Sequence, residues 1–233
     1  MSEIDTGKNY KQINDEMRAI LARTGRKEDA CTLIAVSKTK PVEMMLPVYE
    51  AGCRDFGENK VQEIMDKYEQ MPSDTRWHMI GHLQTNKVKY IVDKVYMIHS
   101  VDSVHLAEAI SKEAVKKNVM VKILLEVNVA CEESKFGVTR EECIAFYEEV
   151  CKLPNLDVRG LMTIAPYVED GEDNRQYFAL LRQLSVDTGI EKNDNRSVEL
   201  SMGMSGDYKV AVEEGATFIR VGTGIFGERN YTV

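Results

Sequence analysis

The segment TLIAVSKT, residues Thr32 to Thr39, is an apolar and largely β-branched run that predicts a buried strand. Near its end stands a lysine, Lys38, and the chain then continues through Lys40 to Pro41. A doubly wound open sheet usually carries a glycine-rich fingerprint at this place, directly after its first strand. Because this chain has no such fingerprint here, the segment favours the other common parallel architecture, a closed barrel.

Seven further runs of the same kind follow, each succeeded by a segment of helical periodicity. The predicted strands are Thr32 to Thr39, Arg54 to Asn59, Arg76 to His82, Val95 to Asp102, Val121 to Asn128, Asp157 to Ala165, Ser197 to Gly203 and Phe218 to Gly227. Strands that alternate with helices form a mainly parallel sheet. Eight such units within 233 residues predict one α/β domain, a (β/α)8 TIM barrel over residues 1–233. The doubly wound open sheet remains the alternative.

The intervening helices carry recognisable end signals. Thr139 with Glu142 is a capping-box pattern, and Asn118 stands where another helix should end. The polar stretch from Gly189 to Ser197 is predicted to be a loop rather than a domain boundary. An additional N-terminal helix, expected to close one end of the domain, is marked by Tyr10, Ile13, Met17, Ile20 and Leu21.

The composition excludes several classes of protein. A formal net charge of −8 gives no basic footprint for nucleic acid, and no run approaches the roughly 20 apolar residues of a membrane span. The N-terminus lacks the apolar core of a signal peptide, so we expect a cytoplasmic protein. The five cysteines include no CxxC pair and the four histidines have no ligand spacing. We therefore predict reduced cysteines packed as small hydrophobes and no metal site.

Polar residues collect where the last two strands end. The reacting groups of a barrel lie at the C-terminal ends of its strands, and the loops after strands seven and eight often hold a phosphate. Ser201 lies in the seventh run and Ser205 just after it, and Gly222 and Thr223 lie in the eighth. The glycine lets the backbone approach a ligand closely, and the N-terminal amides of the helix after Ser205 point outward. Together these features predict an anion site. The alternative is that the glycines only make turns and Ser205 only caps a helix.

Lys38 is the candidate reactive group. It shares strand parity with Ile34 and Val36, so all three side chains should face the barrel interior. Burial favours the neutral amine of a lysine, and the neutral amine attacks a carbonyl to form a Schiff base. An aldehyde that bears a phosphate would use both Lys38 and the anion site. The alternative is an exposed lysine at the end of a strand.

Six segments together resemble a known family. VSKTKP, FGENKVQE, WHMIGHLQTNK, GLMTIAP, LSMGMSGDY and RVGTGIFG, in this order between about Val36 and Gly227, are similar to those of the pyridoxal phosphate homeostasis proteins of the YggS/PROSC type. That family shares its fold with the N-terminal barrel of alanine racemase. The resemblance covers nearly the whole chain and therefore implies the same barrel.

The resemblance also implies a cofactor and the residues around it. Lys38 would carry pyridoxal 5'-phosphate (PLP) as an internal aldimine, and Arg220 would face the pyridine nitrogen. A guanidinium there donates a hydrogen bond to the ring nitrogen but does not protonate it, so the cofactor should stabilise a carbanion only weakly. The phosphate would be held by Ser201 and the amides of Gly222 and Thr223, helped by Ser205 and Gly203. Asn59, Met202 and His82 would lie around the ring and its entrance.

The expected function is that of a carrier in intracellular vitamin B6 homeostasis, with PLP-dependent apo-enzymes as recipients and no catalytic residue assigned. The chain stops soon after its eighth strand, without the second domain that completes an alanine racemase site and dimer, so we expect a monomer. Tyr167, Tyr208 and Tyr231 remain as tyrosines with no evident base partner. Lys60 and Lys87 could provide a second, transient docking point for the cofactor. Two alternatives stay open: a PLP-dependent amino-acid racemase of low activity, and a cofactor-free Schiff-base aldolase.

Overall fold

Eight parallel strands close into a barrel in the computed structural model, which describes residues 4–190 and 198–228. Neighbours in the barrel are neighbours in sequence, from β1 to β8, and β8 closes the circle on β1 through pairs such as Ala35 with Val221. The strands are β1 Thr32–Val36, β2 Asp55–Glu58, β3 Arg76–Met79, β4 Met97–Val101, β5 Val121–Glu126, β6 Leu156–Met162, β7 Glu199–Ser201 and β8 Phe218–Val221. The predicted TIM barrel is confirmed, and the open-sheet alternative is excluded.

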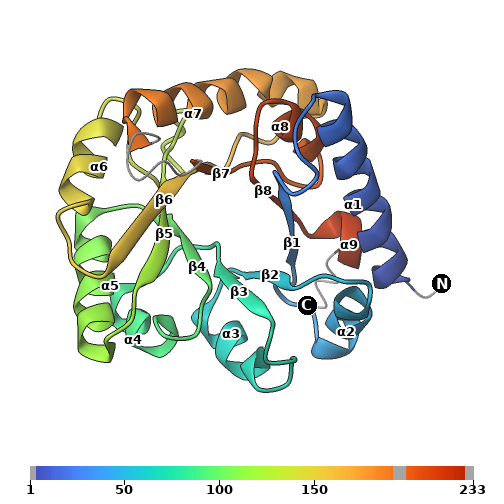
Figure 1. The fold of residues 1–233 in the computed structure, drawn as a ribbon, viewed down its shortest axis with the longest axis horizontal. Coiled ribbons are helices and arrows are strands. Elements are labelled where there is room, and N and C mark those ends of the chain that lie inside the picture. Colours follow the sequence, from blue (N-terminus) through green and yellow to red (C-terminus); the bar gives the residue numbers. More distant parts are fainter. Residues whose placement is uncertain (1–3, 191–197, 229–233) are drawn as a thin grey trace.

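Helices form a ring around the barrel (Figure 1). They are α1 Thr6–Arg23, α2 Val42–Glu50, α3 Val61–Tyr68, α4 Val88–Ile91, α5 Val104–Lys117, α6 Cys143–Val150, α7 Arg175–Asp187, α8 Tyr208–Glu213 and α9 Thr223–Phe226, with 3-10 turns η1 Thr85–Lys87 and η2 Gly171–Asn174. The capping box is present, since Thr139 Oγ1 accepts from the Glu142 amide at 3.3 Å while the Glu142 carboxylate accepts from the Thr139 amide at 3.0 Å. Asn118 ends α5 in the left-handed conformation.

Three expectations need correction. The N-terminal helix α1 does not close an end of the barrel; it packs against α2, α8 and α9 in the outer ring, beside β1 (Figure 1). The eighth run is not a strand to Gly227, because its pairing with β1 ends at Val221 and the chain turns into α9. Cys131 and Cys151 are exposed rather than packed as small hydrophobes. Of the predicted loop from Gly189 to Ser197, residues 191–197 lie outside the described part of the chain.

The core has two layers. The larger lies between strands and helices and includes Trp77, which is 1% exposed. The smaller lies inside the barrel and consists of Ile34, Met97, Leu124, Met162 and Phe218. Burying an aliphatic or aromatic side chain of this size stabilises a fold by roughly 1.5–3 kcal/mol, so both layers hold the strand ends in place. No helix in the described ranges is long and apolar enough to cross a membrane.

Candidate functional site

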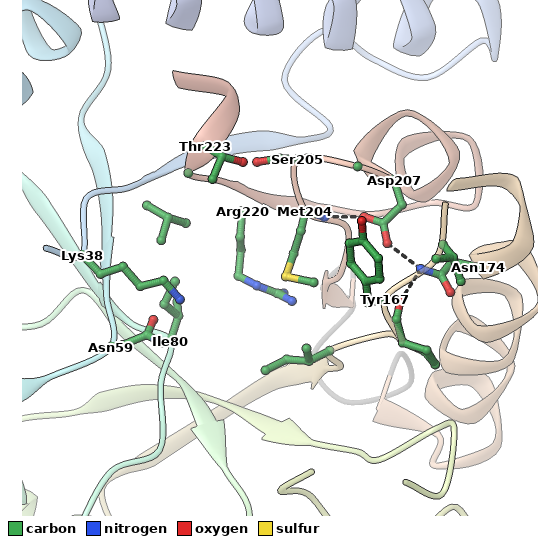
Figure 2. Close-up of a pocket in the computed structure, with 16 residues that line it drawn as sticks. Lys38, Asn59, Ile80, Tyr167, Asn174, Met204, Ser205, Asp207, Arg220 and Thr223 are labelled. Carbon is green, nitrogen blue, oxygen red and sulfur yellow. Dashed lines mark hydrogen bonds between the residues drawn. The ribbon is translucent and has the colours of Figure 1, made fainter. Parts of the chain in front are cut away.

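A cavity of about 430 Å³ opens at the C-terminal ends of the strands. Its walls come from the ends of β1, β2, β3, β6, β7 and β8 and from the loops that follow them. It is lined by Val36, Lys38, Asn59, Ile80, Ile164, Pro166, Tyr167, Val168, Asn174, Met204, Ser205, Gly206, Asp207, Arg220, Gly222 and Thr223. Figure 2 shows Thr223 and Ser205 along one rim, Lys38 with its amine beside Asn59 and Ile80, and Arg220 between them. The barrel mouth therefore holds the candidate site, as predicted.

Lys38 is presented by a tight turn just beyond β1. The turn is closed by a 3.0 Å hydrogen bond from the Lys40 amide to the Ser37 carbonyl, and Thr39 at its third position has φ +63°. Ile34 lies in the barrel interior and Val36 lines the cavity together with Lys38. The predicted parity of these side chains is thus confirmed.

A buried cluster of charged side chains holds the backbone of this turn in place. The Lys67 amine donates to the Ser37 carbonyl at 3.0 Å and to Glu58 Oε1 at 2.8 Å. The Glu63 carboxylate accepts from the Thr39 amide at 2.6 Å and from Lys67 at 3.2 Å. Burial raises the pKa of Glu58 to about 7 even though Lys67 opposes the shift. Sequence reasoning missed this cluster, although the spacing of Glu63 and Lys67 on one helix face was a usable signal.

The rim opposite Lys38 is rich in free backbone amides. The amides of Ser205, Gly206, Gly222 and Thr223 have no hydrogen-bond acceptor among the described residues, whereas the Gly224 amide donates to Ser205 Oγ at 3.3 Å. Donors left open on the wall of a cavity suit an anionic group. Ser205 is not a helix cap, because α8 begins at Tyr208 and Asp207 takes the capping position.

Asp207 holds the neighbouring loops together. One carboxylate oxygen accepts from the Met204 amide at 2.6 Å and the other from Asn174 Nδ2 at 2.7 Å (Figure 2). Asn174 Nδ2 also donates to the Pro166 carbonyl at 3.0 Å. Because these bonds tie the loop after β6 to the loop after β7, the anion rim and the wall carrying Tyr167 form one unit.

Arg220 is a buried cation on the cavity wall. Its side chain is 4% exposed; Nη1 donates to Ser201 Oγ at 2.6 Å and Nη2 to the Thr163 carbonyl at 2.7 Å. Its remaining N–H donors have no acceptor in the described ranges. Burial lowers the pKa of Arg220 to about 10, against the opposing charges of Glu126 and Asp207, so the guanidinium is still protonated at neutral pH. It can offer a hydrogen bond to a ligand acceptor without giving up a proton.

The structure brings together one part of the predicted site. The cavity wall includes Lys38, Asn59, Ser205, Arg220, Gly222 and Thr223. Ser201, Met202 and Gly203 are not on this wall. Ser201 is fully buried, with its Oγ bonded to Arg220 and to His99. Its hydroxyl therefore supports Arg220, whereas the resemblance implied a phosphate contact.

Met202 and Gly203 have structural reasons to lie behind the wall. Met202 is fully buried in the outer core layer, and Gly203 has φ +88°. A Cβ at Gly203 would lie 2.5 Å from the Ala211 Cβ, so the glycine lets α8 approach β7 closely. The resemblance grouped these two residues, which close the seventh predicted run, with the site, but only the loop beyond them reaches the cavity.

His82 lies in a second cavity of about 820 Å³ that shares Asn59 with the first. Its Nδ1 is 3.0 Å from Asp102 Oδ2, and its ring stacks on Phe136 with centroids 4.1 Å apart. Lys60 and Lys87 also line this second cavity. The two lysines are thus next to the candidate site but not inside it.

The tyrosines separate in the same way. Tyr208 is buried and its hydroxyl donates to Glu16 on α1 at 2.6 Å, so it is a core residue, as predicted. Tyr167 lines the cavity and is 95% exposed. Tyr231 lies outside the described residues.

These groups define the chemistry that the cavity can support. A primary amine, a fixed guanidinium and a rim of open amides surround one space. An aromatic aldehyde that bears a phosphate matches all three, since the amine suits the aldehyde, the guanidinium suits a ring nitrogen and the amides suit the phosphate. The residues present therefore fit the phosphorylated pyridine aldehyde that the sequence motifs imply.

Comparison with known proteins gives an independent result. The family model "alanine racemase, N-terminal domain" matches residues 9–230. The pyridoxal phosphate homeostasis protein of Aquifex aeolicus is 47% identical over 221 residues, which cover 94% of this chain and 96% of that protein. More than 90% of each of these two chains is aligned, so the similarity extends over nearly the full length of both sequences.

Two solved structures show the same architecture. PipY of Synechococcus elongatus PCC7942, determined with PLP bound, is 36% identical with a TM-score of 0.76 and covers 91% of this chain and 100% of its own. Alanine racemase of Corynebacterium glutamicum has a TM-score of 0.68 at 13% identity and covers 94% of this chain and 61% of its own. At that identity the racemase shows a common fold alone.

Proposed function

This chain belongs to the pyridoxal phosphate homeostasis protein family, and from that premise we propose that it binds PLP through Lys38 and acts as a carrier in intracellular PLP homeostasis. One observation carries the proposal: a turn-mounted lysine, a buried arginine and a rim of open amides line the same cavity at the barrel mouth. The relatives support it, because one is named for PLP homeostasis and PipY was solved with PLP bound.

Lys38 is the covalent attachment point in this proposal. Its amine nitrogen bonds to the aldehyde carbon of PLP as a Schiff base, and one water is released. The hydrogen bonds that Ser37 and Thr39 make with Lys67 and Glu63 hold the backbone on both sides of Lys38, so the amine is positioned before the cofactor arrives.

The other end of the cavity binds the phosphate. The amides of Ser205, Gly206, Gly222 and Thr223 are the donors for its oxygens, and the Ser205 and Thr223 hydroxyls lie on the same rim (Figure 2). Arg220 faces the ring nitrogen from between the two ends. Asn59 completes the wall on the side of Lys38.

Binding rather than catalysis follows from the residue at the ring nitrogen. PLP acts as an electron sink when its pyridine nitrogen is protonated, and Arg220 donates a hydrogen bond there without supplying that proton. A racemase also needs an acid/base group on each face of the ring. Tyr167 is the tyrosine on the cavity wall, and it is almost fully exposed. The chain is therefore proposed to sequester PLP and deliver it to apo-enzymes in the cytosol, as a monomer.

The experiment is a titration of PLP-free protein with PLP, followed by visible absorption. We expect a yellow complex for the wild type and for Lys40→Ala, whose amine bonds to the carbonyls of the C-terminal segment, and no such band for Lys38→Ala. Adding an apo-enzyme to the loaded protein should restore that enzyme's activity. A protein that stays colourless at saturating PLP would favour the alternative hypothesis of a cofactor-free Schiff-base aldolase.

A further inference from the structure

An unbroken chain of side-chain contacts crosses the interior of the barrel behind Arg220. Its Nη1 lies 2.6 Å from Ser201 Oγ, which lies 2.9 Å from His99 Nδ1. His99 Nε2 lies 2.9 Å from His78 Nδ1, and His78 Nε2 lies 2.9 Å from Asp55 Oδ1. The chain links the cavity at one end of the barrel to Asp55, the first residue of β2, at the other.

The two ends fix the direction of every hydrogen bond. An ionised Asp55 can only accept, so His78 Nε2 carries its proton, and in a neutral ring Nδ1 must then accept. His99 Nε2 is therefore the donor to His78, and His99 Nδ1 must accept in turn. Its donor is the Ser201 hydroxyl, whose oxygen is left to accept from Arg220. Each bond is satisfied in one direction only, from Arg220 toward Asp55.

Burial keeps these protonation states. His78, His99 and Ser201 are fully buried, and Asp55 is 5% exposed. Desolvation lowers the pKa of both histidines, most strongly that of His99, so both rings stay neutral. Burial alone would raise the pKa of Asp55, but hydrogen bonds from His78 and Arg76 hold it below its usual value, so the carboxylate stays ionised.

The far end is anchored next to solvent. Arg76, the first residue of β3, donates through Nε to Asp55 Oδ1 at 2.9 Å, and its side chain is 47% exposed. A cation outside the barrel thus neutralises the carboxylate that ends the chain. Linear chains of hydrogen bonds in a low-dielectric interior polarise one another, so each link strengthens the next.

We propose that Asp55, His78, His99 and Ser201 are positioning residues for the cofactor, which hold and polarise Arg220 so that its free N–H donors face the ring nitrogen. The part of this inference that concerns the cofactor rests on the proposed function, whereas the hydrogen-bond chain itself does not. Ser201 fixes Nη1 while the Thr163 carbonyl fixes Nη2, so the guanidinium cannot rotate away from the cavity. Asp55 acts on the cofactor only through this chain, because it lies at the other end of the barrel.

The first test uses the protein without PLP and measures the histidine ring nitrogens by two-dimensional proton–nitrogen NMR, with His82→Asn and His105→Asn removing the other two sets of signals. We expect both His78 and His99 to be neutral with the proton on Nε2 between pH 6 and 8. A proton on Nδ1 of either ring, or a charged ring, would overturn the proposed direction. A failure of PLP to bind the wild type would leave this result intact and count against the proposed function alone.

The second test compares Ser201→Ala and Asp55→Asn with Ser111→Ala, which also removes a buried serine hydroxyl but lies on α5, where that hydroxyl donates to the Pro154 carbonyl. We expect PLP to dissociate about tenfold faster from Ser201→Ala and Asp55→Asn, the effect of one hydrogen bond to a charged group. The visible absorption band of PLP bound to these two variants should also shift. Ser111→Ala should match the wild type in both rate and band, and Ser201→Thr, which keeps a hydroxyl, should restore the wild-type rate and band. Wild-type spectra and rates in all variants would refute the positioning role.

Discussion

Replacing Lys67 with methionine removes the cation that lies under the Lys38 turn. Lys67 is 8% exposed, and its amine bonds to Glu58 Oε1 at 2.8 Å, to the Ser37 carbonyl at 3.0 Å and to Glu63 Oε2 at 3.2 Å. Glu58 is fully buried, and its second oxygen has no hydrogen-bond partner in the described part of the chain. Lys67→Met therefore leaves a buried carboxylate without its counter-charge.

Breaking a buried ion pair from one side costs about 3–5 kcal/mol. The total stability of a typical domain is roughly 5–15 kcal/mol, so the loss is a large part of the whole. The cost must depend on pH, because burial raises the pKa of Glu58 to about 7 in the wild type. At pH 5 the carboxyl is already protonated and gains little from Lys67; at pH 8 it is charged and gains the most. The loss should thus be about 3 kcal/mol or more at pH 8 and clearly smaller at pH 5.

The measurement is urea unfolding at both pH values, followed by the fluorescence of Trp77, the single and buried tryptophan. Glu58→Gln combined with Lys67→Met should recover part of the stability, because the remaining side chain is neutral. Lys117→Met, which breaks a more exposed ion pair with Asp93, should cost under about 1 kcal/mol. A loss below about 1 kcal/mol at pH 8 for Lys67→Met, or a double variant no more stable than the single one, would refute this reasoning.

Three further changes test other parts of the structure. Burial, with a smaller contribution from Asp102, raises the pKa of Glu126 from 4.5 to about 7, so the stability it contributes is complete below pH 4.5 and is lost as the pH rises through 7. Urea unfolding should therefore show Glu126→Gln gaining on the wild type between pH 5 and pH 8 by up to about 3 kcal/mol, and a constant difference would contradict it. Gly203→Ala places a Cβ 2.5 Å from the Ala211 Cβ at φ +88°, and should lower the free energy of unfolding by at least about 2 kcal/mol; a thermal midpoint equal to the wild type would rule out the close contact. Tyr167→Phe should bind PLP as the wild type does, and neither protein should exchange the α-proton of amino acids in deuterated water. If the wild type shows this exchange and Tyr167→Phe loses it, the protein is a racemase instead.

The barrel was predictable because its signals are local and repeated. Each strand is marked by a short apolar run. The absence of a glycine-rich fingerprint after Val36 favours the prediction of a barrel over that of an open sheet. The placement of α1 was not predictable in the same way. Its apolar face needs a partner, but only closure of the barrel shows that the open position lies beside β1, between α8 and α2.

Strand parity with Ile34 and Val36 predicted Lys38 at the barrel mouth, and the family resemblance placed Arg220 there; both side chains line the cavity. The resemblance assigned Ser201 to the phosphate, but its position in the seventh run does not show that its hydroxyl bonds to Arg220 and His99. The histidine pair was missed because metal-ligand spacing was the pattern sought. His78 and His99 are each the third residue of consecutive strands, and only closure of the barrel places one ring against the other.

The measurement to make first is borohydride reduction of the PLP-loaded protein, followed by proteolysis and mass spectrometry of the labelled peptide. Reduction turns the carbon–nitrogen double bond of a Schiff base into a stable single bond, so the label stays where the cofactor was bound. We expect the phosphopyridoxyl mass on Lys38 and on neither Lys40 nor the two lysines of the adjoining cavity, Lys60 and Lys87. A label on any of these three with Lys38 unmodified, or no label on a protein that binds PLP, would contradict the assignment of Lys38.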